Sequence, residues 1–538
     1  MKLWLFSALL CLWVLVSSVS PEFTPVSSEL RNAHGFSRGL LNLVVLPGDE
    51  PFRGVPAWAF GAAMAAFLLL GMVKPGSPVG ARGLAAEVAG TTILLIVALA
   101  PAVTAYRVVL APRTFILCAV LISATRGLRM ARSVPVQRMP ALSGALGAAF
   151  FASALVQTSA TYGGNYSGFL HLDRSVAARA PFLRERPDLA RSLITYDAGY
   201  DGQFMYLMAF DPLLQRFADR PSEYGAYIDS PPYRYGRIGF SALTAVVSAG
   251  RPERYPVVML WLIVAAHFAL ATVLAHLAAA NGMSPFVGLL YLAIPGFMSS
   301  LMSALPEALA AAGLVAGYYW WESRKVMLSA LAFGGALLVR ETGVVLLVML
   351  VVELGRDRAE RRRAALLLAG ALTPVCVWRS FAASRFFGEF GWAALFTNPG
   401  DLGVPFAGLT DLWFAGVRGT QPAPEITGAV VFPVLLTLAL SLAVAMWRLR
   451  AGPLETAAVI YAIVAVSLNY EKIWSHLPSG ERGTFELFVC LLLLLLTRRD
   501  GPAWSRRALA AFFAIMLGYT FFVAVDASTS RLALGLIR

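Results

Sequence analysis

Long apolar runs separated by short charged turns make up most of this chain. The runs lie near residues 3–19, 56–73, 84–104, 107–125, 139–158, 256–279, 285–301, 306–322, 326–339, 343–355, 364–380, 428–447, 453–469, 484–497 and 507–525. A helix that crosses the apolar part of a bilayer needs roughly 20 residues, and most of these runs approach that length. The pattern therefore predicts an all-α, polytopic membrane protein, a helical bundle of about fifteen spans.

Basic residues cluster in a few of the turns and set the expected orientation. The strongest clusters are RGLRMARSVPVQR (126–138), RDRAERRR (356–363), RLR (448–450) and RRDGPAWSRR (498–507). Cytoplasmic turns carry an excess of Lys and Arg. Placing every cluster in the cytoplasm puts the N-terminus inside, the C-terminus outside, and the loops 159–255 and 381–427 on the outer side. Residues 238–250 are apolar but too short to span, so we expect them to form a helix at the outer interface.

The first four runs are expected to form a membrane module of their own. This N-terminal module of about four helices would cover residues 1–135, and residues 136–538 would form the main transmembrane domain. The run 3–19 also has the features of a signal peptide, but an uncleaved first helix fits the alternation of charged turns better. The expected location is the inner (plasma) membrane, crossed many times.

Composition agrees with a chain that is surrounded by lipid. Hydrophobic residues make up 58% and charged residues 14% of the 538 residues, whereas soluble domains carry about 25% charged residues. The net charge of +13 falls in the turns, so it indicates orientation in a membrane and gives no reason to expect nucleic-acid binding. The four cysteines lie in apolar runs and the five histidines are scattered, so neither predicts a disulfide framework or a histidine metal site.

The outer loop 159–255 is the most polar part of the chain and contains the candidate chemistry. Within it, YDAGYDGQFMYLMAFDP (196–212) is followed by YIDSPPYRYGRIGF (227–240). Two glycines flank Asp201, so the chain can turn tightly there and present its carboxylate. A carboxylate can take a proton from an acceptor hydroxyl, and Arg234 and Arg237 can hold a phosphate. A lipid phosphate at the bilayer surface is the substrate class that this combination predicts.

The same stretch resembles a group of bacterial membrane enzymes, the GT-C glycosyltransferase superfamily. The shared pattern is Y-D-G-Q-F-x-Y-x-x-A-x-D-P, followed by D-x-P-x-Y-R-Y-x-R-I. The matching residues are Tyr200, Asp201, Gly202, Gln203, Phe204, Tyr206, Asp211, Pro212, Asp229, Pro231, Tyr233, Arg234, Tyr235 and Arg237, with weaker matches at Pro306-Glu307 and Arg340-Glu341. The resemblance covers residues 139–525.

The resemblance implies a GT-C-like bundle that moves a sugar from a polyprenyl-phosphate donor to a glycan, lipid or protein acceptor on the extracytoplasmic face. Asp201 would be the general base, with Asp197 as the alternative. A divalent cation, Mg or Mn, held by Asp201 and Glu307 is a further option. The expected substrate-binding residues are Tyr200, Gln203, Tyr206, Asp229, Tyr233, Arg234, Arg237, Glu307, Arg340, Glu341 and Arg482.

Each of these residues also has a structural interpretation that stays open at the level of sequence. Asp201 could stabilise a turn, Asp197 could cap the loop, and Asp211 could be a turn residue or a helix cap. Glu307 opens a helix, where the helix dipole alone stabilises an acid. Arg340 and Glu341 could form a structural pair, and Arg379 and Arg482 could extend to lipid head groups from outer helix ends.

Two other functions and one further resemblance complete the sequence-based expectations. A transporter or flippase for a lipid-linked sugar would show inverted repeats and broken helices with charges at mid-membrane. A surface-polysaccharide polymerase or ligase would have its largest outer loop late in the chain. Residues 1–135 faintly resemble the VanZ-like membrane module through Glu87 and Arg113, without an assignable role.

Overall fold

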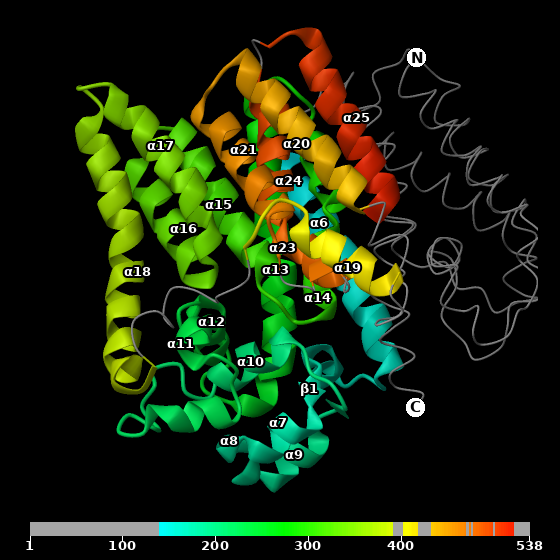
Figure 1. The fold of residues 1–538 in the computed structure, drawn as a ribbon, viewed down its shortest axis with the longest axis vertical. Helices are drawn as coiled ribbons and strands as arrows, with labels where there is room; N and C mark the ends of the chain where they lie inside the picture. Colours follow the sequence, from blue (N-terminus) through cyan, green and yellow to red (C-terminus); the bar gives the residue numbers. More distant parts are fainter. Residues whose placement is uncertain are drawn as a thin grey trace, which may run out of the picture.

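The computed structural model describes residues 139–390, 402–417, 432–469, 473–474, 477–498 and 501–520. The predicted N-terminal module, with Glu87, Arg113 and the first four runs, lies outside the described residues. Most described residues are helical, and one short parallel pair of strands joins β1 (Leu172–Asp173) to β2 (Thr195–Tyr196). The all-α prediction is therefore confirmed for the described part of the chain (Figure 1).

Four of the described helices are long and apolar enough to cross a membrane. They are α6 (Met139–Thr161), α13 (Tyr255–Ala280), α18 (Arg361–Phe390) and α20 (Phe432–Leu449). Shorter apolar helices α16 (Val326–Val339), α21 (Pro453–Val466) and α24 (Phe485–Thr497) lie beside them, together with α15 (Glu307–Glu322), α17 (Val344–Arg356) and α25 (Ala503–Tyr519). The protein is thus a helical bundle with several candidate membrane spans, and the helices fall where the apolar runs predicted them.

One predicted span is broken. Residues 285–301 were expected to cross as one helix, but they form the 3-10 helix η6 (Pro285–Ala293) and then α14 (Pro295–Met302), bent by 65° relative to each other. The break falls at Pro295, which has no backbone N–H to continue the helix and restricts the residue before it. The predicted crossing is therefore interrupted at this position, and the run forms two helices in place of one.

The long helix α18 extends past its predicted end. The apolar run ends near residue 380, yet the helix continues to Phe390, so the first residues of the predicted outer loop 381–427 are helical. The indole N–H of Trp378 donates to the carbonyl of Tyr235 at 2.6 Å, and Phe386 packs against Tyr224 and Tyr235. The extension therefore supports the polar loop from one side.

The polar loop folds into short helices against one end of the bundle (Figure 1). They are η3 (Tyr166–Leu170), α7 (Arg174–Arg179), α8 (Pro181–Arg184), α9 (Pro187–Ser192), α10 (Asp201–Met208), η4 (Pro221–Ala226), α11 (Pro231–Tyr235), α12 (Gly239–Val247) and η5 (Pro252–Arg254). As the length of the apolar segment 238–250 predicted, α12 is too short to span. It contacts α13 and α16, and leaves Val246 and Val247 exposed.

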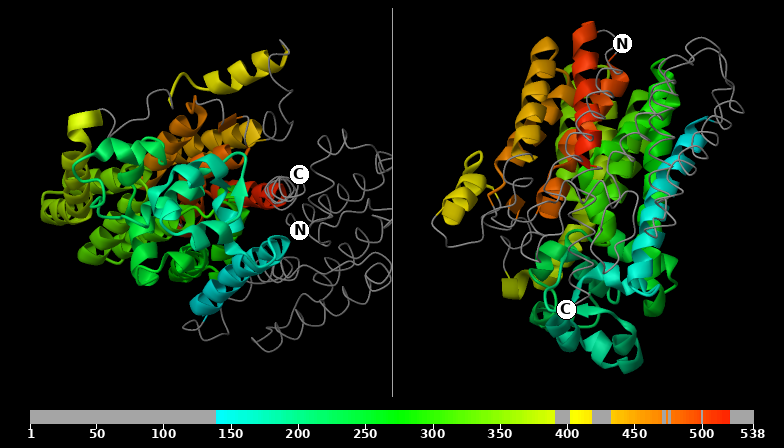
Figure 2. Two further views of the ribbon diagram at one scale, coloured as in Figure 1. Left: turned by 90° about the horizontal axis from the view of Figure 1, so that it is seen from below. Right: turned by 90° about the vertical axis from the view of Figure 1, so that its right-hand side faces the viewer.

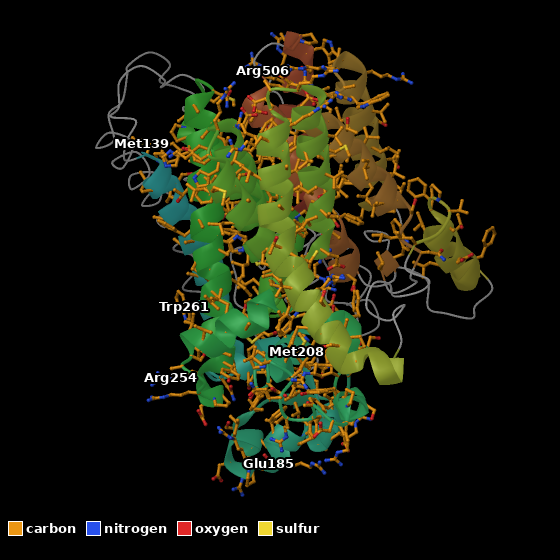
Figure 3. All side chains as sticks on the ribbon, turned by 90° about the vertical axis from the view of Figure 1, so that its left-hand side faces the viewer. Met139, Glu185, Met208, Arg254, Trp261 and Arg506 are labelled. Carbon is orange, nitrogen blue, oxygen red and sulfur yellow. The ribbon has the colours of Figure 1, made fainter. Side chains whose placement is uncertain are left out.

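Within the described residues, the basic turns lie at the opposite end of the bundle from the polar loop. Figure 3 shows Arg506 at one end and Glu185, Met208 and Arg254 toward the other. The connections from α17 to α18 and from α20 to α21 lie at the Arg506 end (Figure 1). This separation is what the alternation of charged turns requires.

Small residues allow the bundle helices to approach closely. A Cβ atom on Gly317 of α15 would lie 2.7 Å from the ring of Phe333 in α16, and one on Gly313 would lie 2.9 Å from Ala336. Close approach through small residues is the usual means of helix packing in membranes. Figure 2 shows the bundle from two further directions; in the right-hand view the loop helices lie below it.

The backbones of α14 and α23 (Leu477–Gly483) approach each other even more closely. A Cβ atom on Gly296 would lie 2.5 Å from the carbonyl oxygen of Glu481, a backbone atom that cannot rotate away. We expect Gly296→Ala to destabilise the fold by about 1–3 kcal/mol, because the two backbones must separate. Gly335→Ala in α16 is the control, since nothing lies within 4 Å of its Cβ position. Thermal unfolding in detergent measures both, and an unchanged midpoint for Gly296→Ala would contradict the interpretation.

Candidate functional site

Charged side chains from distant segments meet where the polar loop rests on the bundle. They form a continuous chain of ion pairs in which carboxylates and guanidinium groups alternate. In order, the chain runs through Asp229, Arg234, Asp201, Arg482, Glu307, Arg340 and Glu486. We call these seven residues the ion-pair chain.

Asp201 joins the loop to the C-terminal part of the protein. Its Oδ1 accepts a hydrogen bond from Arg234 at 2.8 Å, and its Oδ2 accepts one from Arg482 at 2.6 Å, across 281 positions of sequence. Burial opposes ionisation of Asp201, but the two guanidinium groups outweigh it and hold the pKa of this carboxyl well below its usual range. Asp201 is therefore a firmly ionised carboxylate with both oxygens occupied.

Local sequence explains why Asp201 lies at this position. It is the first residue of α10, where the N-terminal end of the helix favours a negative charge. The next residue is a glycine, and a Cβ atom on Gly202 would lie 2.2 Å from the carbonyl oxygen of Ser303. The ring of His171 contacts the same turn that Ser303 belongs to, with Nε2 lying 3.2 Å from the carbonyl oxygen of Met302. The start of α10 is thus seated directly on the turn that leads into α15.

The deeper half of the ion-pair chain is centred on Arg340. This residue caps the C-terminal end of α16, where the helix dipole favours a cation. Its Nη1 donates to Glu307 Oε1 at 3.0 Å and its Nε donates to Glu486 Oε1 at 3.0 Å. The hydroxyl of Thr342 also donates to Glu486. Both carboxylates are buried, with 3% of each side chain exposed.

A second cluster lies beside the first. Arg237 donates from Nε to Glu341 Oε2 at 2.7 Å, and Arg379 approaches the same carboxylate at 3.9 Å. Burial opposes ionisation of Glu341, but Arg237 outweighs it and lowers the pKa of Glu341 to about 2. The guanidinium of Arg237 also lies 4.3 Å from the ring centre of Tyr233.

The remaining predicted residues divide between the site and its support. The ring of Tyr200 lies 5.1 Å from the guanidinium carbon of Arg482, and Asp229 binds Arg234 with both oxygens. Gln203 instead accepts from the backbone of Asp173 at 2.9 Å, which makes it part of the loop scaffold. Tyr206 is fully buried among aromatic side chains of the loop and does not join the ion-pair chain.

The other two acids of the loop motif have structural positions. Asp197 has 91% of its side chain exposed and pairs with Arg174 at 3.3 Å. Asp211 accepts from the backbone N–H groups of Gln215 and Arg216 and from the hydroxyl of Tyr224. Asp211 therefore stabilises a turn, as its alternative interpretation expected, and Asp197 lies outside the ion-pair chain.

Sequence reasoning missed Glu486. It lies in the apolar run 484–497, and a lone acid in such a run is itself a signal, because an unpaired charge there is costly. Glu481, one turn earlier, was also overlooked. It is buried, accepts from Ser299 at 2.7 Å and from Tyr519 at 2.9 Å, and burial raises its pKa to about 7.

The donor set of the site does not fit a divalent cation. Asp201 and Glu307, the predicted ligands, both pair with arginines, which would repel a second positive charge. The described residues contain no group of three or more His, Cys, Asp or Glu side chains arranged for a metal ion. The chemistry of the site is therefore considered from its own side chains.

Comparison of the chain with models of protein families, with curated proteins and with solved structures gave no match.

The pairing of Glu341 with Arg237 predicts a change in acid sensitivity. A carboxylate whose pKa is lowered on folding stabilises the protein above its ordinary pKa, near 4.5, and this contribution is lost as the pH falls toward about 2. We expect Arg237→Gln to remove much of this contribution and to flatten the decline of the thermal midpoint between pH 4.5 and 2. Arg191→Gln, which breaks an exposed pair with Asp188, is the control. Identical pH profiles for wild type and Arg237→Gln would refute this.

Proposed function

We propose that this protein is a membrane glycosyltransferase that moves a sugar from a polyprenyl-phosphate donor to a glycan, lipid or protein acceptor. The proposal places it in the inner (plasma) membrane, with the polar loop on the extracytoplasmic face. The observation that carries the proposal is the chain of ion pairs that links Arg234, Arg482 and Arg340 through Asp201 and Glu307. The resemblance of the loop motif to GT-C enzymes supports the same reaction class.

The arrangement of arginines suits a phosphate at the membrane surface. Guanidinium groups bind phosphate through paired hydrogen bonds. Three helices, α10, α15 and α24, also direct their N-terminal ends to this region, each with an acid in the first turn. Helix N-termini favour anions. A polyprenyl-phosphate donor would keep its chain in the bilayer while its phosphate reaches these groups.

The site is balanced in charge before a donor binds. The ion-pair chain and the second cluster together contain five arginines, at positions 234, 237, 340, 379 and 482, and five acids, at positions 201, 229, 307, 341 and 486. A donor phosphate would therefore have to replace carboxylates as partners of the guanidinium groups. As the bond from sugar to phosphate breaks, negative charge grows on the phosphate, and the guanidinium groups would stabilise it.

The general-base role predicted for Asp201 carries a condition. The two guanidinium groups that bond to its oxygens favour the ionised form and lower its affinity for a proton, so the carboxylate would act as a base only once Arg234 or Arg482 has moved to the donor. Hydrogen bonds in a site without substrate often rearrange on binding, so the role stays a prediction.

The alternatives have different structural support. The bent pair η6 and α14 is a broken span of the kind a transporter would use, but its residues 285–302 carry no charge of their own. A polysaccharide polymerase or ligase would use a similar site with a glycan as acceptor. The group transferred, a single sugar or a polysaccharide, separates this function from the proposed one.

Transfer assays test the proposal directly. Purified protein in lipid vesicles is incubated with a panel of polyprenyl-phosphate sugars and with glycan, lipid and peptide acceptors, and products are identified by mass spectrometry. Transfer from at least one donor is expected. Movement of the intact lipid-linked sugar across the vesicle without transfer would favour the flippase and overturn the proposal.

Replacing Asp201 should abolish transfer in a folded protein. We expect Asp201→Asn to lower the transfer rate by at least about 100-fold, because the arginines lose their shared carboxylate and the donor site loses its order. Asp188→Asn, an exposed acid in the same loop, is the control and should retain full activity. Full activity of Asp201→Asn would overturn the assignment of this site.

A further inference from the structure

Two buried polar atoms in the ion-pair chain have no hydrogen-bond partner among the described residues. They are Oε2 of Glu307 and Nε of Arg482. Glu307 is 2% exposed, and its other oxygen, Oε1, lies 3.0 Å from Arg340 Nη1 and 3.5 Å from Arg482 Nε. Leaving a buried acceptor and a buried donor unpaired costs free energy, so such atoms call for an explanation.

The chemistry of these atoms specifies a ligand. Glu307 Oε2 can accept a hydrogen bond, and the N–H at Arg482 Nε can donate one. The two groups belong to side chains that approach within 3.5 Å of each other. A single hydroxyl group satisfies both, because it donates its O–H to the carboxylate and accepts from the guanidinium. A phosphate oxygen could accept from the arginine but could not donate to the carboxylate.

Glu307 differs from Asp201 in this respect. Both oxygens of Asp201 accept from guanidinium groups, at 2.8 and 2.6 Å, whereas Glu307 keeps one oxygen open. Of the two carboxylates that share Arg482, Glu307 is therefore the one with an oxygen at which a proton can add without displacing a hydrogen bond.

We infer that Glu307 Oε2 binds the acceptor hydroxyl and receives its proton, and that Asp201 is a positioning residue that orients Arg234 and Arg482. This inference rests on the proposed glycosyltransferase function. In the step, the acceptor oxygen forms a bond to the anomeric carbon of the donor sugar. The bond from that carbon to the phosphate oxygen breaks, and its electron pair leaves with the polyprenyl phosphate. The hydroxyl proton moves to Glu307, so atoms and charges balance.

Arg482 links Glu307 to the proposed donor site. This side chain lies between Asp201 and Glu307, pairing with both, and only 16% of it is exposed. Its Nη2 bonds to Asp201 while its Nε faces Glu307, so the acceptor hydroxyl at Glu307 would lie beside the arginines proposed to hold the donor phosphate.

The test compares Glu307→Gln with Asp201→Asn under steady-state conditions. We expect Glu307→Gln to lower kcat by about 100-fold or more with the donor KM within about twofold of wild type. We expect Asp201→Asn to raise the donor KM as well. Azide separates a base from a structural group, because it is an anion that attacks without losing a proton. With azide in place of the acceptor, Glu307→Gln should therefore form glycosyl azide and polyprenyl phosphate as fast as the wild-type protein does with azide.

Glu481→Gln is the matched control. Glu481 is a buried acid next to Arg482 in sequence, but it binds the hydroxyls of Ser299 and Tyr519 and forms no ion pair among the described residues. The oxygen of the new amide can accept from one hydroxyl while its NH2 group donates to the oxygen of the other, so this variant should stay folded and keep its transfer rate. Thermal unfolding in detergent shows whether each variant is folded.

The outcomes are distinct. Transfer by wild type together with transfer by Glu307→Gln at more than half the wild-type rate overturns the inference and leaves the proposed function standing. A folded Glu307→Gln protein that azide does not rescue also overturns it. If wild type transfers no sugar from any donor, the proposed function fails, and the inference with it. If Glu307→Gln does not fold, Glu307→Asp is measured instead: its shortened carboxylate should lower kcat at unchanged donor KM, and an unchanged kcat overturns the inference.

Discussion

The pairing of Arg482 with Asp201 and Glu307 is the interaction on which the arrangement of the site depends. A guanidinium group buried at the end of an apolar bundle is stable only when carboxylates compensate it, and removing one partner of a buried pair is costly. Arg482 meets this requirement with one acid from the polar loop and one from the start of α15. The same requirement, repeated at Arg234 and Arg340, holds together segments that are far apart in sequence.

Close backbone contacts make this pairing geometrically possible. Gly202 allows the start of α10 to touch the carbonyl of Ser303, and Gly296 allows α14 to touch the backbone of α23. The first contact brings Asp201 toward the turn before Glu307. The second brings the helix that carries Arg482 onto the same turn region. Two positions without side chains thus place three charged groups within reach of one another.

A site with balanced charges has a consequence for its mechanism. Every arginine that could hold a phosphate already has a carboxylate partner, so ligand binding must exchange partners rather than fill an open positive pocket. Such an exchange keeps the empty site stable and links donor binding to the release of particular carboxylates. One carboxylate oxygen, Oε2 of Glu307, has no partner among the described residues. The proposed acceptor can bind to this oxygen without competing with the donor phosphate for a guanidinium group.

The sequence by itself determined the positions of most helices, the shortness of α12 and the turn at Asp201. These features depend on local composition: the length of an apolar run, a glycine beside an acid, a charged turn. The bend at residues 294–295 also has a local cause, Pro295, but a single proline does not reveal the angle between the two helices that it separates.

Only the tertiary structure decided which charges pair. Nothing in the chain near Asp201 indicates Arg482, which lies 281 positions away, and Glu486 was hidden in an apolar run. It also separated Asp201 from Asp197, four residues earlier, by burying one and exposing the other. The attraction between two charges weakens with distance, so an ion pair needs its two groups within a few ångströms of each other. The packing of whole helices, and not the order of residues along the chain, decides which groups come that close.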